Sequence, residues 1–225
     1  MKYKKVLITL SAIVLFGIIL FIGNNFFTDP FVESSIERGE EIYNHSCIQC
    51  HGNNGEARKI SSATTLNNQE FLSLVSDEFL FKTIAEGRDN TKMPAFGLDN
   101  GGKLDQKEIK DIIAFIRAWQ NKSIKMDTPE VIAGDTNIGQ KLYKKNCLSC
   151  HANGIGPNVI NPDFLKQASN EFLWATIAYG RSNTAMGPSL KGLNGVRQLT
   201  GEEINSLVVF LRSQGEVKEE NENTE

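Results

Sequence analysis

Hydrophobic residues recur at helical spacing in two similar stretches of this 225-residue chain. Residues 104–120 (LDQKEIKDIIAFIRAWQ) and 199–215 (LTGEEINSLVVFLRSQG) place apolar side chains three and four positions apart. That spacing predicts amphipathic helices, each with one buried face. No stretch shows the alternation of apolar and polar residues that is typical of a half-buried β-strand. The pattern therefore predicts an all-α protein.

A longer hydrophobic run marks the N-terminus. Residues 6–22 are seventeen uncharged residues, and Lys2, Lys4 and Lys5 precede them. A membrane span needs about 17 to 25 apolar residues, whereas the core of a cleaved signal peptide has roughly 7 to 15. No small-x-small cleavage signal follows, so we expect a single-pass transmembrane helix rather than a signal peptide. The lysines favour the cytoplasmic side, which places the rest of the chain on the periplasmic or extracytoplasmic side of the cell membrane.

An internal repeat divides the rest of the chain. Residues 79–93 (FLFKTIAEGRDNTKM) and 172–186 (FLWATIAYGRSNTAM) are identical at ten of fifteen positions, at an offset of 93. Each copy precedes one of the two amphipathic stretches, so the repeat predicts two tandem helical domains. The predicted segments are an anchor at 1–23, a tether at 24–35, domain 1 at 36–121, a linker at 122–134, domain 2 at 135–215 and a disordered acidic tail at 216–225.

The charge of each domain indicates which partners it can bind, and its size limits its hydrophobic core. Residues 37–121 carry ten basic and thirteen acidic side chains, a net charge of −3, and residues 129–215 carry eight basic and six acidic, a net charge of +2. Domains that bind nucleic acid usually present a strongly basic surface, so we expect no nucleic-acid partner. Domains this small bury limited apolar area, so we expect each domain to have a small hydrophobic core.

The cysteines provide the candidate chemistry, because all four lie in CIQCH at 47–51 and CLSCH at 147–151. This is the motif of covalent c-type haem attachment, in which two thiols bond the haem and the histidine coordinates its iron. A disulfide framework does not explain the histidine after each pair, and adjacent cysteine and histidine converge poorly on tetrahedral zinc. We predict two covalently bound haem c groups with His51 and His151 as iron ligands. Their thioether bonds are expected at Cys47, Cys50, Cys147 and Cys150.

The repeat also identifies a second ligand for each iron. Met93 and Met186 end the two copies of the shared Gly-Arg-x-Asn-Thr-x-Met sequence, whereas Met126 has no counterpart. Methionine in a helical stripe usually fills gaps in the core. These two instead lie in loops rich in Gly, Pro, Asn and Thr, where rigid turns can aim a thioether at a fixed point. We therefore predict Met93 and Met186 as distal ligands.

Two arginines occupy matching positions in the same loops, Arg88 and Arg181. Arginine forms bidentate pairs with carboxylates, so each is a candidate contact for a haem propionate. The alternative is a local salt bridge. His45 stands close to the first motif, but Lys145 replaces it in the second copy, so we interpret it as a surface residue.

Together these residues resemble the class I cytochrome c family over about three quarters of the chain. In that family a Cys-x-x-Cys-His motif near the start of a small helical domain is followed by a loop methionine and a closing helix. The resemblance implies that helices cross closely at Gly39 and at Gly139. It also implies that the Pro157 carbonyl orients the histidine of domain 2. Domain 1 has no matching proline, which leaves the acceptor for His51 open.

With both axial positions of each iron filled, no site remains for a substrate, and outer-sphere electron transfer is the expected activity. We expect a membrane-anchored dihaem cytochrome c that passes single electrons between redox proteins of a respiratory chain. It would act as a carrier or as a subunit of a membrane complex, and not as an enzyme. The alternative is a dihaem enzyme, such as a thiosulfate dehydrogenase or a peroxidase, with one catalytic haem. That alternative needs an open or unusual axial position, and neither distal loop contains histidine or cysteine.

Overall fold

The structure is a computed structural model that describes residues 30–57, 63–193 and 195–222. In these ranges every regular element is a helix, apart from one isolated β-bridge between Gly97 and Leu104. The all-α prediction is therefore confirmed for the described part of the chain.

The predicted transmembrane helix at 6–22 lies outside the described residues. Among the helices of the described ranges, none combines the length and the apolar character needed to span a bilayer.

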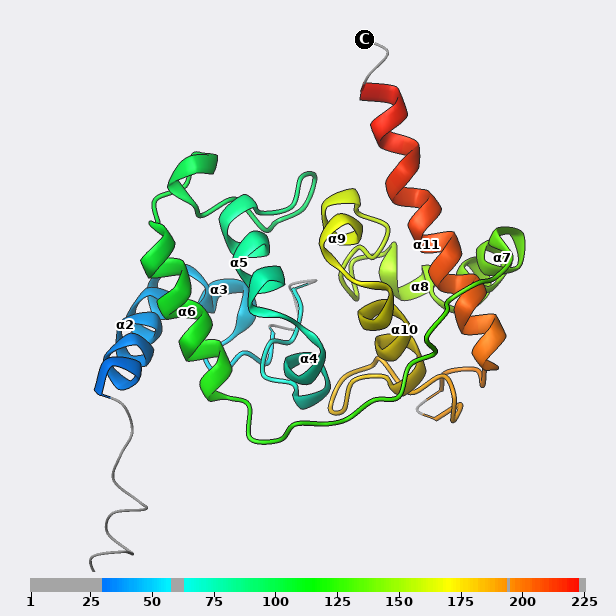
Figure 1. Ribbon diagram of the computed structural model, residues 1–225, viewed down its shortest axis with the longest axis horizontal. Coiled ribbons are helices and arrows are strands. Elements are labelled where there is room, and N and C mark those ends of the chain that lie inside the picture. Colours follow the sequence, from blue (N-terminus) through cyan, green and yellow to red (C-terminus); the bar gives the residue numbers. More distant parts are fainter. Residues whose placement is uncertain (1–29, 58–62, 194, 223–225) are drawn as a thin grey trace, which may run out of the picture.

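The two domains repeat one order of helices (Figure 1). Domain 1 contains α2 (Pro30–Ser46), α3 (Ile48–His51), α4 (Gln69–Leu74), α5 (Asp77–Glu86), the 3-10 helix η1 (Leu98–Asn100) and α6 (Gln106–Ala118). Domain 2 contains α7 (Thr136–Asn146), α8 (Leu148–His151), α9 (Pro162–Gln167), α10 (Asn170–Tyr179) and α11 (Gly201–Glu222). A segment without regular structure runs along the lower edge of the molecule in Figure 1 and joins α6 to α7.

Two helix ends differ from the sequence-based expectation. Helix α2 begins at Pro30, inside the predicted tether, because proline suits the first turn of a helix, where its missing N–H is not needed. Helix α11 continues through Glu222, whereas the sequence predicted disorder after residue 215. The segment 216–222 is rich in glutamate and contains lysine, and both residues have high helix propensity.

Each domain is closed by a pair of crossed helices that meet at a glycine. A Cβ atom on Gly39 of α2 would lie 2.0 Å from the Asp111 carbonyl oxygen of α6. A Cβ atom on Gly139 of α7 would lie 2.0 Å from the Ser206 carbonyl oxygen of α11. Only glycine allows these backbones to approach so closely, so the two predicted crossings are confirmed.

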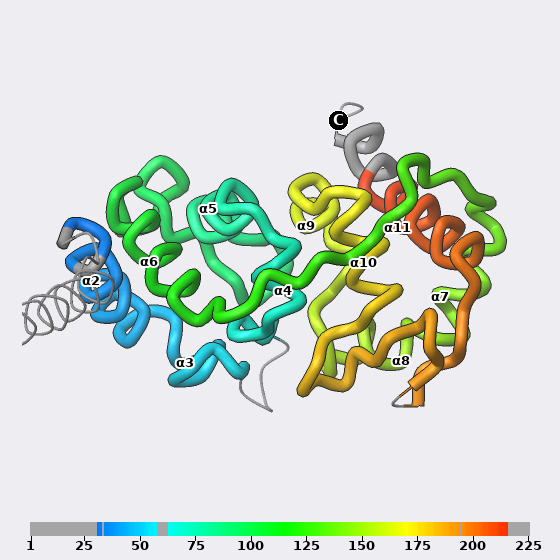
Figure 2. Tube along the Cα trace, turned by 60° about the horizontal axis from the view of Figure 1, so that its bottom comes forward, coloured from blue at the N-terminus to red at the C-terminus, as the bar shows by residue number. Residues whose placement is uncertain are grey.

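The cores of the two domains meet through phenylalanine rings. Phe79 of α5 stacks on Phe172 of α10 with ring centroids 5.4 Å apart, and Phe164 of α9 approaches Phe79 edge-on at 6.3 Å. Phe71 of α4 packs edge-on against Phe172 at 6.2 Å. Figure 2 shows α4 and α5 facing α9 and α10 across this junction. The domains therefore share one continuous hydrophobic core.

Candidate haem-binding site

One continuous cavity of about 1160 Å³ opens onto both domains. Pockets for a single small molecule typically measure about 300 to 1,000 Å³, so this cavity is large enough for more than one ligand. Every site residue predicted from the sequence lies in its wall: Cys47, Cys50, His51, Arg88, Met93, Cys147, Cys150, Pro157, His151, Arg181 and Met186. The structure thus brings the two halves of the repeat together at one site.

Both motifs adopt a single helical turn. The His51 backbone N–H donates to the Cys47 carbonyl over 3.0 Å, and the same bond joins His151 to Cys147 over 3.0 Å. One turn directs the two cysteines and the histidine toward the same side. Burial raises the pKa of the Cys47 thiol to about 12 and that of the Cys147 thiol to about 11. No disulfide joins the cysteines of the described residues.

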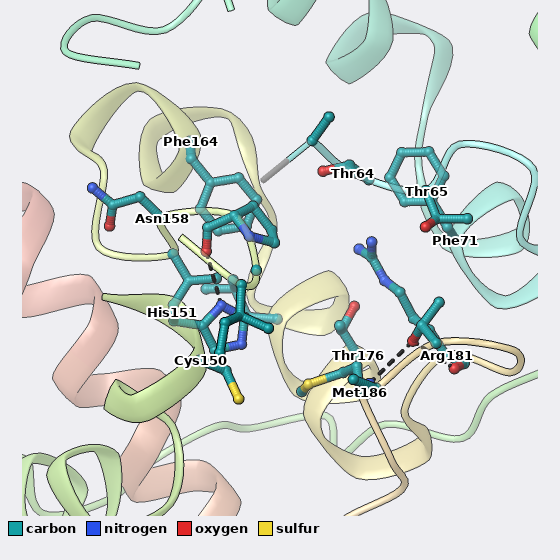
Figure 3. A pocket seen from close by; sticks show the side chains of 18 of the residues that line it. Thr64, Thr65, Phe71, Cys150, His151, Asn158, Phe164, Thr176, Arg181 and Met186 are labelled. Atoms are coloured by element: carbon teal, nitrogen blue, oxygen red, sulfur yellow. Dashed lines mark hydrogen bonds between the residues drawn. The ribbon is translucent and has the colours of Figure 1, made fainter. Parts of the chain in front are cut away.

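A backbone carbonyl orients each histidine ring. Nδ1 of His51 lies 3.0 Å from the Thr64 oxygen. Nδ1 of His151 lies 2.8 Å from the Pro157 oxygen, and a dashed line marks this bond at His151 in Figure 3. Because a carbonyl can only accept, Nδ1 carries the proton, and the lone pair of Nε2 is available to a metal. Burial lowers the pKa of both imidazoles, which favours the neutral form that binds iron.

Thr64 is a candidate site residue that the sequence analysis did not identify. It occupies the position that Pro157 takes in domain 2, because the two residues are 93 apart, which is the offset of the repeated loop. The backbone carbonyl makes the contact, so the side chain can differ. Extending the repeat backwards from residue 79 at this offset would have found it.

The two methionine loops have the same hydrogen bonds. Thr91 Oγ1 donates to the Arg88 carbonyl over 2.8 Å and accepts from the Met93 N–H over 3.1 Å. In domain 2, Thr184 Oγ1 makes the same two bonds to Arg181 and Met186, at 2.8 and 3.1 Å. These hydroxyls therefore hold the backbone of the loop.

Positive φ angles complete each turn. Asn90 has φ of 57° and Asn183 has φ of 59°, in the left-handed region that asparagine tolerates better than most residues. Figure 3 shows the sulfur of Met186 directed toward the side of the cavity that carries Cys150 and His151. The loop thus presents a thioether opposite the motif.

The two arginines have no carboxylate partner at bonding distance. Among the ion pairs of the described residues, none involves Arg88 or Arg181. Each Nε atom is buried and lacks a hydrogen-bond partner in that part of the chain. Burial lowers the pKa of both guanidinium groups to about 10, so they remain cations at neutral pH. Unpaired buried donors of this kind fit an anionic group inside the cavity, such as a carboxylate of the haem.

The remaining candidates lie away from the cavity. Met126 is not part of its wall. His45 is exposed, and its Nδ1 atom lies 2.8 Å from the Glu41 carbonyl of its own helix, which agrees with a surface residue.

Two haem-attachment motifs, each in a small helical domain that presents a matched methionine loop, define a two-domain c-type cytochrome. The sequence model of the family described as cytochrome c oxidase, cbb3-type, subunit III matches residues 34–116 and 134–211. The chain belongs to this family, and it carries two covalent haem c groups.

A curated relative is the cbb3-type cytochrome c oxidase subunit FixP of Bradyrhizobium diazoefficiens, which is 25% identical over 192 residues. The match covers 79% of this chain and 60% of the relative, so the chain spans less than two thirds of that protein. A solved chain of the reducing HAO-like protein complex of Kuenenia stuttgartiensis is 18% identical, with coverage of 79% of this chain and 96% of that chain. Its TM-score of 0.41 is too low to support a structural argument.

Proposed function

We propose that the protein transfers single electrons through two His/Met-ligated haems on the extracytoplasmic side of a membrane. One observation carries this proposal: each domain presents a histidine and a loop methionine to the same cavity, with matching hydrogen bonds around both. When bound, each haem supplies an iron that gains or loses one electron. His51 with Met93, and His151 with Met186, would hold the iron and leave it no free position for a substrate.

The residues of the chain hold the group and control its surroundings. Cys47 and Cys50 attach the first haem and Cys147 and Cys150 attach the second. The carbonyls that accept from Nδ1 fix each imidazole in the tautomer that binds iron. Arg88 and Arg181 present donors for the propionates. Phenylalanine, leucine and isoleucine side chains line the cavity and exclude water from the macrocycle.

Residues 6–22 anchor the chain in the membrane, and the partners are redox proteins of a respiratory chain. The relative FixP is named as a subunit of a cbb3-type oxidase, and this supports a terminal oxidase of that class as the electron acceptor. A membrane anchor keeps both domains close to such a complex, because tethering raises the local concentration to about millimolar for a short flexible linker.

The purified holoprotein in detergent tests the activity. We expect one electron per haem on titration with a chemical reductant, rapid reoxidation by a soluble one-electron acceptor, and no change in the ferrous spectrum with carbon monoxide. Carbon monoxide binding at one haem, or peroxide turnover, would contradict the proposal and favour the dihaem enzyme. A pull-down from solubilised membranes, followed by haem staining, tests the partner: an oxidase is expected, and its absence would contradict that assignment.

A further inference from the structure

The junction between the domains has an approximate two-fold relation, because residues 93 apart in sequence make the same contacts in opposite directions. Asn68 Nδ2 donates to the Ser182 carbonyl over 2.9 Å, and Asn161 Nδ2 donates to the Asp89 carbonyl over 2.9 Å. Each asparagine also caps its own helix, α4 or α9, through Oδ1. The same side chain thus starts a helix and binds the opposite domain.

Two carboxylates add further hydrogen bonds between the domains. Glu70 Oε2 accepts from the Ser182 hydroxyl over 2.8 Å, and Asp163 Oδ2 accepts from the Asp89 N–H over 2.7 Å. Glu70 and Asp163 are again 93 residues apart. In both directions, the contacted residue directly follows an arginine of the methionine loop. The junction therefore holds Arg88 and Arg181 in place from the opposite domain.

Each guanidinium lies closer to an aromatic ring of the opposite domain than to the ring of its own. Arg88 Cζ is 5.1 Å from the centroid of Phe164 and 5.7 Å from that of Phe79. Arg181 Cζ is 4.8 Å from the centroid of Phe71 and 5.8 Å from that of Phe172. These distances are within the range of cation–π interaction. Both charges therefore lie at the border between the two haem sites.

Charged groups of each domain also affect the arginine of the other domain. Burial lowers the pKa of Arg88, and the negative charge of Asp163 in domain 2 acts to raise it. Burial and the positive charge of Arg88 lower the pKa of Arg181, whereas the negative charge of Glu70 acts to raise it. Arg88 and Glu70 both belong to domain 1. In a cavity with largely apolar walls, charges are screened less than in water.

We propose that Arg88 and Arg181 are shared by the two haem sites, so that each cation raises the reduction potential of the haem in the opposite domain as well as that of its own haem. A positive charge stabilises the reduced form, because reduction adds one negative charge. A unit charge roughly 12 Å away, at an effective dielectric constant of about 20, changes a reduction equilibrium by about tenfold. This inference depends on the proposed function, because it requires two redox-active haems.

Potentiometric titration of the full-length holoprotein tests this sharing. The Met186→His variant assigns the two waves, because histidine in place of methionine lowers the potential of its own haem. We expect Arg88→Gln and Arg181→Gln each to lower both potentials, with a shift of up to about 59 mV for a tenfold change at the opposite haem. The conservative Arg88→Lys should keep most of the potential, because it keeps the charge, and exposed Lys110→Gln on α6 is the matched control.

Three results separate the explanations. If each Arg→Gln variant shifts only the haem of its own domain, the cations act locally and the sharing is wrong, while the proposed function stands. High-spin iron in the wild type, or the absence of one-electron waves, would contradict the proposed function itself. Asp163→Asn keeps an acceptor for the Asp89 N–H and removes a negative charge beside Arg88, so it should raise the potential of the domain 1 haem. If Asp163→Asn left the potential of the domain 1 haem unchanged, the proposal would also be overturned, whether or not the arginine variants fold.

Discussion

A single hydroxyl closes each methionine loop. In domain 2, Thr184 Oγ1 joins the Arg181 carbonyl to the Met186 N–H, and the Arg181 N–H donates to the Met186 carbonyl over 2.7 Å. The loop therefore forms a small closed ring of hydrogen bonds between the arginine and the methionine. A change at the threonine alters how firmly the thioether is held, although the threonine itself need not touch the iron.

Thr184→Ala should loosen this loop. It removes two hydrogen bonds, each of which contributes roughly 0.5 to 1.5 kcal/mol, so we expect the free energy of unfolding to fall by about 2 kcal/mol. Cyanide should also displace Met186 faster. Denaturant titration and the rate of cyanide binding to the ferric protein measure these effects. Thr184→Ser keeps the hydroxyl and should resemble the wild type; if serine is as disruptive as alanine, the hydroxyl is not the cause.

The two helix crossings differ in chemistry despite their similar shape. Where α2 crosses α6, the nearly buried Asp111 accepts from Arg38 Nε over 2.8 Å and from Lys107 Nζ over 2.9 Å. Where α7 crosses α11, Ser206 Oγ accepts a backbone N–H, that of Asp135, over 3.1 Å. Burial acts to raise the pKa of Asp111, but the hydrogen bonds from Arg38 and Lys107 outweigh it and hold the pKa below its usual value.

This carboxylate makes domain 1 sensitive to acid. A depressed pKa in the folded state stabilises the protein above the pKa of unfolded aspartate, about 3.9, and this stability is lost as the pH falls through the lower folded value. Asp111→Asn should therefore cost about 2 kcal/mol near neutral pH and flatten the loss of stability on acidification. Denaturant midpoints at about pH 7 and about pH 3 test this; an equal loss in the variant and the wild type would contradict it, and exposed Asp99→Asn is the control.

The glycine at each crossing allows the two helices to approach closely. Gly39→Ala would place a methyl group 2.0 Å from the Asp111 carbonyl oxygen, and neither backbone can yield without separating α2 from α6. Overpacking typically costs about 1 to 3 kcal/mol and occasionally more, so we expect at least about 3 kcal/mol and poor haem retention in domain 1. Thermal unfolding and haem staining measure both. Gly201→Ala, which has open space around it, should be tolerated; equal damage there would show that the crossing is not the cause.

The closing helices were predictable from sequence because their apolar residues are periodic over many turns. Helices α4 and α9 were not, since six residues are too few for a periodic signal and an asparagine cap starts each one. The junction of the domains could not be predicted either. In the sequence, Phe71 and Phe172 are typical of ordinary core residues, and nothing indicates that each packs against the other domain. The candidate haem ligands could be identified from the sequence because each belongs to a local motif that occurs in both copies of the repeat, and all of them line the cavity.

At the scale of the whole molecule, both halves of the site open into one cavity, and the aromatic core is continuous across the junction. The proposed electron transfer depends on this pair of domains. The membrane anchor proposed at residues 6–22 would keep this pair of domains near its partners.

A version that begins at Asp29 retains all of α2 and should be soluble, with the absorption spectrum of the full-length protein. It should exchange electrons with small soluble acceptors at unchanged rates, yet support membrane respiration less well at equal abundance, because the tether is lost. Stopped-flow kinetics and oxygen uptake by membranes measure the two effects. Full-length protein that washes off membranes with carbonate would contradict the anchor.

The ferric sulfur-to-iron charge-transfer band tests most directly whether Met93 and Met186 each complete a low-spin, six-coordinate iron. The wild type should show this band, Met93→Ala or Met186→Ala should each halve it, and both together should abolish it. Met126→Ala should leave it unchanged, because that residue lies outside the cavity. A band that survives in the double variant, or that is missing from the wild type, would show that the two methionines are not the ligands.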